Sequence, residues 1–453
     1  MSRKIIVLFL VSLMIFIGLD ILASAQVNGW LDGDSSSEDI IRQKGLPRIG
    51  EGDVTVDFMT VWASGTSAEM EEKWLTEEVI KDYPFIGNEI ERLGTNPLKE
   101  AATIRVIAGI PPTIAHISGG YAIDEFIRQG VLQDVTKYWD YYNLESVVNA
   151  TLASAYKFNG KYYGFPLSDA IQALLFWDKN VFAAAGVPEP PYDTWDDFFE
   201  AAEIWKKAKP GIPFYAYSLN PGWYGFERAL VQAATMYGKD FIFRIYNGNA
   251  TLQDFTNFLN FNKKLISVSN NDFASLEGTQ GIHEIVLRGD AALCYSGSWG
   301  LAAFKKAGIL EGENLGYSLL PGVKMHFTTI AGYIVFAKSG KEAAGEAIAV
   351  HSMLKDTQMA LNISKDNIPA RSDIVMDPAD GWSDLVLFVY NQLEDTQIIP
   401  RANTGLPSKI LSDMAPIFSS AMTGTISIIE VAQELKSIQD YNQENYQFIR
   451  WGE

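Results

Sequence analysis

Few residues of this chain have the types and spacing that catalysis requires. No two of its 4 histidines have the i, i+4 spacing of a helical zinc site. The sequence also contains no G-x-S-x-G elbow, Walker loop or dinucleotide glycine fingerprint. It therefore predicts no catalytic residue, no bound metal and no cofactor. The 55 acidic residues leave one alternative open, because two carboxylates could meet in a cleft as they do in a glycoside hydrolase.

Aromatic side chains are the more informative group. Phe, Trp and Tyr make up 12% of the chain, and 11 residues are Trp. Flat apolar rings suit the C–H faces of sugars, although any one Trp can equally be part of the core. The formal charge of -19 argues against nucleic acid as a partner, because such a chain repels phosphate backbones.

The N-terminus has the pattern of an export signal. Arg3 and Lys4 precede an apolar run over residues 5–19, and small residues at 23–25 offer a cleavage site. The run is shorter than the roughly 20 residues that span a bilayer, so we expect cleavage after Ala25, with a retained anchor as the alternative. The only Cys is Cys294, far from this site, so we expect export without a Cys-linked lipid anchor and without an internal disulfide.

The elements that would position a site begin after a polar segment. Residues 26–53 are rich in Gly, Ser and Asp and predict a flexible spacer. Alternating apolar residues predict strands that begin at Val54 and over residues 102–108, 291–295 and 333–337. Helical spacing predicts helices over residues 70–79 and from Ala343 onward. Thr194 and Asp197 form a capping-box pattern that predicts a helix from there to residue 208.

Five separated segments resemble the family 1 extracellular solute-binding proteins, which include the maltose- and glucose-type binding proteins of ABC importers. The segments follow the order of the family's motifs over most of the chain after residue 53. They are residues 108–112 (A-G-I-P-P) with 129–134 (Q-G-V-L-Q-D), residues 159–166 (N-G-K-Y-Y-G-F-P) with 174–179 (L-L-F-W-D-K), 186–188 (G-V-P) and 194–198 (T-W-D-D-F), residues 289–293 (G-D-A-A-L) with 297–299 (G-S-W), residues 332–338 (G-Y-I-V-F-A-K) with 368–371 (I-P-A-R), and residues 424–425 (G-T) with 430–435 (E-V-A-Q-E-L).

The chain departs from the family pattern at three places. Thr113 replaces the usual Asp, and Trp177 and Asp178 stand where Tyr and Asn are commoner. After Pro166 the chain lacks the His-Arg-x-Asn stretch of many glucose-type members. This last difference argues against a simple glucose-type assignment.

The resemblance implies an α/β fold of two periplasmic-binding-protein-like lobes, joined by hinge crossings near Pro166 and near residues 326–331, with a ligand cleft between them. Residues 54–165 plus 327–371 would form the first lobe, and residues 166–326 plus 372–453 the second. It also implies that the protein binds a neutral mono- or oligosaccharide, performs no chemistry on it, and delivers it to the membrane-embedded permease subunits of an ABC transporter. We expect a monomer in the periplasm or at the extracellular face.

Loops at the ends of strands supply the candidate ligand contacts, because ligands of such sheets meet those loops. Trp299 of the G-x-W element is the first candidate, since this Trp commonly stacks on the sugar in the family, and a core position is its alternative. The other candidates are Trp223, Asp169 just past the hinge proline, Trp62 and Ser64 in the first strand-to-helix loop, His116, Tyr333 and Arg371. Core packing is the alternative for Trp62 and His116, and a structural ion pair is the alternative for Arg371.

Overall fold

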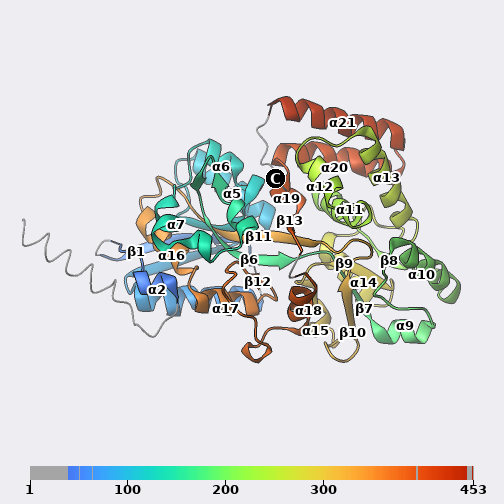
Figure 1. Cartoon of the computed structure of the whole chain (residues 1–453), viewed down its shortest axis with the longest axis horizontal. Helices are drawn as coiled ribbons and strands as arrows, with labels where there is room; N and C mark the ends of the chain where they lie inside the picture. Colours follow the sequence, from blue (N-terminus) through green and yellow to red (C-terminus); the bar gives the residue numbers. More distant parts are fainter. Residues whose placement is uncertain (1–38, 50–51, 64, 394–395, 446–450, 452–453) are drawn as a thin grey trace, which may run out of the picture.

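The computed structural model describes residues 39–49, 52–63, 65–393, 396–445 and 451 (Figure 1). The predicted signal over residues 1–25 and the first part of the spacer lie outside these residues. In the described part of the chain no helix is both long enough and apolar enough to cross a bilayer.

The first sheet has seven strands in the order β12-β6-β11-β3-β1-β2, with β13 paired to β11. β1 runs parallel to β2 and β3, whereas β11 runs antiparallel to β3 and β6. The strands are β1 (Val54–Thr60), β2 (Ile86–Arg92), β3 (Ile114–Ser118), β6 (Phe165–Ile171), β11 (His326–Val335), β12 (Ile368–Pro369) and β13 (Ile398–Pro400).

The second sheet has four strands in the order β10-β7-β9-β8. Its strands are β7 (Leu174–Asp178), β8 (Tyr215–Ala216), β9 (Leu293–Ser296) and β10 (Leu315–Leu319). A separate hairpin pairs β4 (Lys157–Phe158) with β5 (Lys161–Tyr162). The strands predicted at Val54 and near residues 291 and 333 are confirmed as β1, β9 and β11.

Helices surround both sheets, and the two groups lie side by side in Figure 1. The helices around the first sheet are α2 (Ile40–Lys44), α3 (Thr66–Lys73), α4 (Val79–Asp82), α5 (Thr95–Ile107), α6 (Asp124–Arg128), α7 (Thr136–Tyr142), α8 (Ala150–Ser154), α16 (Glu342–His351) and α17 (Lys355–Ile363). Those around the second are α9 (Lys179–Ala185), α10 (Trp195–Ala208), α11 (Gly222–Tyr237), α12 (Lys239–Tyr246), α13 (Leu252–Ile266), α14 (Gly278–Leu287), α15 (Gly300–Lys306), α18 (Asp384–Leu393), α19 (Ala402–Gly405), α20 (Ser408–Thr423) and α21 (Ile428–Asn445).

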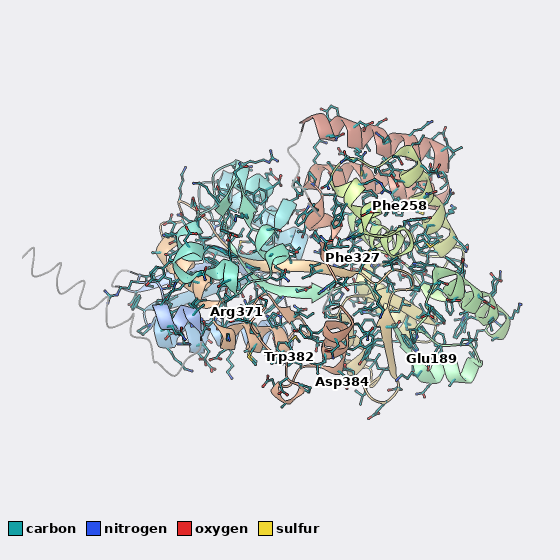
Figure 2. All side chains as sticks on the ribbon, viewed as in Figure 1. Glu189, Phe258, Phe327, Arg371, Trp382 and Asp384 are labelled. Carbon is teal, nitrogen blue, oxygen red and sulfur yellow. The ribbon has the colours of Figure 1, made fainter. Side chains whose placement is uncertain are left out.

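Aromatic packing holds the helical layer of the second group together. Phe258 of α13, labelled in Figure 2, stacks on Phe418 of α20 with ring centroids 5.1 Å apart. Phe226 of α11 contacts both rings. Such offset and edge contacts stabilise a core beyond the area they bury. Part of the aromatic excess in the sequence therefore serves this core.

The chain changes from one sheet to the other at short connections. Gln172 and Ala173 join β6 to β7, and residues 320–325 join β10 to β11. A longer connection that contains α18 leaves the first sheet after β12 and returns to it at β13. Pro166 lies inside β6, so the first change of sheet comes six residues later than the predicted crossing. The predicted lobe boundaries otherwise stay a prediction.

Two local predictions differ from the structure. Residues 102–107 belong to α5, and Ala108 is its C-cap, so no strand forms there. Ile104 and Ile107 face solvent on this helix, and their β-branched side chains imitate strand alternation. Part of the predicted flexible spacer is ordered, since Asp39 caps α2 and Ile41 is fully buried.

Candidate functional site

A cleft of about 410 Å³ lies where the two groups of elements meet, a size typical of small-molecule sites. Its walls come from the ends of β1 and β3, from β6 and β11, from the starts of α11, α14 and α15, and from the loops before β12 and α19. The lining residues are Val61, Trp62, Ser118, Ser168, Ala170, Pro221, Trp223, Tyr224, Gly278, Thr279, Trp299, Thr329, Ala331, Lys365, Asn367 and Arg401. The parallel strands β1 and β3 thus present their carboxyl ends to the cleft, as expected for an α/β sheet.

Three tryptophans from separate parts of the sequence line this cleft. Trp62 follows β1, and its ring meets the buried His116 ring edge-on at 4.6 Å. Trp223 lies in the first turn of α11, and Trp299 directly precedes α15. Trp223 and Trp299 are partly exposed, whereas Trp62 is 5% exposed. The geometry therefore offers more than one flat apolar surface to a ligand in the cleft.

Close backbone packing fixes the position of Trp299. Gly297 lies between β9 and Trp299, and a Cβ atom added there would come within 2.2 Å of Cζ3 of the Trp299 ring and 2.6 Å of the carbonyl oxygen of Ile171. The next residue, Ser298, donates its backbone N–H to that same carbonyl at 2.9 Å. Only glycine leaves room for the indole at this turn.

We expect Gly297→Ala to displace the indole and to lower the free energy of unfolding by about 1–3 kcal/mol, the usual cost of overpacking. Thermal melting measures the stability, and tryptophan fluorescence reports the displaced ring. Gly94→Ala is the matched control, because the nearest atom to its added Cβ is 3.8 Å away. If both substitutions lowered the stability equally, the close contact between Gly297 and the Trp299 ring would make no measurable contribution to stability.

The profile of the family described as bacterial extracellular solute-binding protein matches residues 67–351. The chain belongs to this family. An uncharacterized ABC transporter extracellular-binding protein of Pyrococcus horikoshii is 24% identical to it over 369 residues, which are 80% of this chain and 82% of that protein. A probable sugar-binding periplasmic protein of Mesorhizobium japonicum is 25% identical over 308 residues, 65% of this chain and 69% of its own length.

Solved structures confirm the fold class. The bacterial solute receptor AcbH, described as having an exclusive preference for β-D-galactopyranose, superposes with a TM-score of 0.74. The superposition covers 88% of this chain and 100% of AcbH at 15% sequence identity. The predicted α/β, two-lobed periplasmic-binding-protein-like fold is therefore confirmed for this solute-binding protein.

Asp169 does not line the cleft of the solute-binding protein. Side chains alternate along β6, so Ser168 and Ala170 face the cleft while Asp169 points to the opposite face. There its Oδ2 lies 2.8 Å from Nε2 of His326, a contact with the distance of an ion pair but without the angles of a hydrogen bond. Together with Arg371, the two side chains line a separate cavity of about 210 Å³.

His116 and Tyr333 are buried behind Trp62 and are absent from the residues that line the cleft. Both contact the same oxygen of the buried Glu71, at 2.9 Å from Nδ1 of His116 and at 3.0 Å from the Tyr333 hydroxyl, which donates. Burial, together with the Glu71 carboxylate, raises the pKa of Tyr333 well above its ordinary value. Of these three residues, His116 contacts the Trp62 ring, and its buried position agrees with the core alternative for His116.

Arg371 has the contacts of a structural ion pair. Its guanidinium is 2% exposed and pairs with Asp39 at 2.9 Å and with Asp373 at 2.7 Å. It also donates to the carbonyl of Met353 at 2.7 Å. Figure 2 shows Arg371 on the side of the molecule that holds the first sheet. Ser64, the remaining candidate, lies outside the described residues.

Sequence reasoning missed most of the polar lining of the cleft. Arg401 and Lys365 belong to no motif that the sequence singled out, and Asn367 precedes the I-P-A-R segment by one position. Asn367 nevertheless lies close to the G-x-W element, since its Oδ1 accepts a hydrogen bond from Ser298 at 3.2 Å. Within the described ranges no group of His, Cys, Asp or Glu side chains is arranged to hold a metal ion.

Proposed function

We propose that this solute-binding protein binds a carbohydrate in the cleft lined by Trp62, Trp223 and Trp299 and delivers it to the permease subunits of an ABC importer. The convergence of the three indoles is the observation that carries the proposal. Stacked rings cover the apolar face of a pyranose, while hydroxyl and amide groups beside them bond its hydroxyls. Ser118, Ser168, Thr279, Thr329 and Asn367 supply such groups in the same cleft.

The relatives support this ligand class. The Mesorhizobium relative is described as sugar-binding, and a Haloferax volcanii relative, 22% identical over 359 residues, is described as a xylose/arabinose-binding protein. The same proposal includes export by the signal over residues 1–25, a monomeric state, and action outside the cytoplasm without a Cys-linked lipid. The acidic charge supports the expectation that nucleic acid is not a partner.

Hydrolysis of the sugar is the competing function. The cleft has no Asp or Glu among the described residues that line it, and a glycoside hydrolase of the common type needs two carboxylates on either side of the scissile bond. We therefore propose binding without turnover, and without a cofactor.

The deciding experiment incubates purified protein with a panel of mono- and oligosaccharides and measures binding by thermal shift. A bound sugar at 100 times its dissociation constant raises the stability by about 2.7 kcal/mol. Chromatography of the recovered sugar should then show it unchanged. Product formation at roughly 1 per second or faster would favour the hydrolase, and a panel without any thermal shift would count against carbohydrate binding.

A further inference from the structure

The charge of the cleft is opposite to that of the whole molecule. The protein carries a formal charge of -19, yet the Lys, Arg, Asp and Glu side chains among the described residues that line the cleft are the two basic ones, Lys365 and Arg401. Carboxylates are the usual acceptors for sugar hydroxyls, but none lines this cleft in the described part of the chain. The ligand must therefore be compatible with a cationic environment.

Lys365 follows α17 and leads into β12. Its ammonium has no hydrogen-bond or ion-pair partner among the residues that the structure describes. It lies 6.0 Å from the centroid of the Trp62 ring, the outer limit of a cation–π contact. Burial lowers the pKa of Lys365, and the negative charges of Asp366 and Glu71 oppose this effect. A partly buried cation without a partner costs stability, and a bound anion would remove that cost.

Contacts with other side chains of the protein hold the Arg401 guanidinium in place. Its Nε donates to Oδ1 of Asn403 at 2.7 Å, and one terminal nitrogen lies 3.4 Å from Oε1 of Glu227. Burial raises the pKa of Glu227, although Arg401 acts in the opposite direction. The guanidinium carbon lies 5.9 Å from the centroid of the Trp223 ring, so this cation stands beside one of the three indoles.

A third basic side chain, Arg228, is buried next to a residue that lines the cleft. Arg228 is 2% exposed, and its Nε and Nη2 atoms have no hydrogen-bond partner in the described structure. Its guanidinium carbon lies 4.4 Å from the centroid of Tyr224, whose side chain lines the cleft. Buried guanidinium groups with free donors add positive potential to a site. Glu227 lies beside Arg401, whereas the Lys365 ammonium has no carboxylate within ion-pair distance among the described residues.

We propose that the cleft selects an acidic sugar, one whose ring carries a single carboxylate, with Lys365 recognising the carboxylate, Arg401 adding positive charge beside Trp223, and the tryptophans contacting the ring. This inference rests on the proposed carbohydrate function and replaces the neutral sugar expected from the sequence. A uronic acid has the required combination of one negative charge, an apolar ring face and several hydroxyls. Charge-assisted hydrogen bonds to a carboxylate are about twice as strong as those to neutral groups.

Calorimetric titration with matched pairs tests the inference. The pairs are D-glucuronate with D-glucose and D-galacturonate with D-galactose, together with the disaccharides built from each. The acidic member of at least one pair should bind about tenfold more tightly or better, which corresponds to 1.4 kcal/mol or more. The preference should shrink as salt is raised, because ions screen charge recognition.

Two variants test whether Lys365 causes the preference for the acidic sugar. Lys365→Met should abolish most of the preference for the acid while leaving the affinity for the neutral partner within about threefold, roughly 0.6 kcal/mol. Lys207→Met is the matched control, since Lys207 is exposed on α10 away from the cleft. A melting curve verifies that each variant is folded. Lys365→Gln serves in place of the methionine variant if that protein fails to fold.

The outcomes separate this inference from the proposed function. Neutral sugars that bind as tightly as their acids, or an acid preference that survives Lys365→Met, would overturn the acidic-sugar inference and leave carbohydrate binding intact. No binding in either series would overturn the acidic-sugar inference, and the absence of any thermal shift across the wider sugar panel would overturn both. An acid preference lost with Lys365 and kept in the Lys207 control supports both.

Discussion

Trp299→Ala is expected to weaken sugar binding by about 2–4 kcal/mol, which is 30- to 1000-fold in affinity. The indole is partly exposed at the cleft, and close packing on Gly297 fixes its position. Truncation to alanine removes the flat surface that a pyranose would cover, whereas it removes little of the protein core. Calorimetric titration of the variant with the sugar found for the parent protein measures the loss directly.

A core tryptophan provides the contrast. Trp205 of α10 is 1% exposed, and its Nε1 donates to the backbone carbonyl of Ile212 at 2.9 Å. Trp205→Ala should lower the free energy of unfolding by about 3–5 kcal/mol and leave the affinity of the folded protein nearly unchanged. If Trp299→Ala instead melted as early as this control and bound sugar like the parent, Trp299 would be scaffold and the stacking role would be wrong.

Helices and strands could be predicted from the sequence where interactions between nearby residues determine them. The capping box of Thr194 and Asp197 is present at the start of α10, since both of its reciprocal hydrogen bonds form. The alternation at Val54 gives β1, whose buried side chains are core residues of the first sheet. The predicted strand over residues 102–108 is wrong because tertiary context places an exposed helix there, and β-branched residues alone do not distinguish the two.

The candidate site was predictable only in part. The tryptophans could be found, because each follows a strand or begins a helix and because the sequence holds more indoles than a core requires. The sequence could not show on which face of the sheet Asp169 lies. That face depends on the register of β6, because a shift of one residue moves every side chain to the opposite face. Lys365 and Arg401 reach the cleft through loops that bring distant parts of the chain together, and no local spacing signals such contacts.

Arg371 shows how the same residue type supports two interpretations. An arginine in the I-P-A-R segment near a cleft can bind a ligand, and a buried arginine can equally pair with carboxylates. The structure favours the second, because Asp39 and Asp373 both contact the guanidinium and Asp39 comes from the segment predicted to be a flexible spacer. The sequence contained no signal that residue 39 would lie beside residue 371.

We therefore expect Arg371→Met to lower the free energy of unfolding by about 3–5 kcal/mol, because it removes the cationic member of a buried ion pair with Asp39. The affinity of the folded variant for sugar should stay close to that of the parent, since Arg371 does not line the cleft of the tryptophans. Chemical unfolding and calorimetric titration on the same preparation measure the two quantities.

Lys355→Met is the matched control for this prediction. Lys355 lies 3.3 Å from the same Asp373 but is partly exposed, so its loss should cost about 1 kcal/mol or less. A larger loss for Arg371 than for Lys355 is expected, because Arg371 is buried and pairs with both Asp39 and Asp373, whereas Lys355 makes only the outer contact with Asp373. An Arg371→Met protein that kept its stability and lost its sugar affinity would contradict this assignment and return Arg371 to the ligand site.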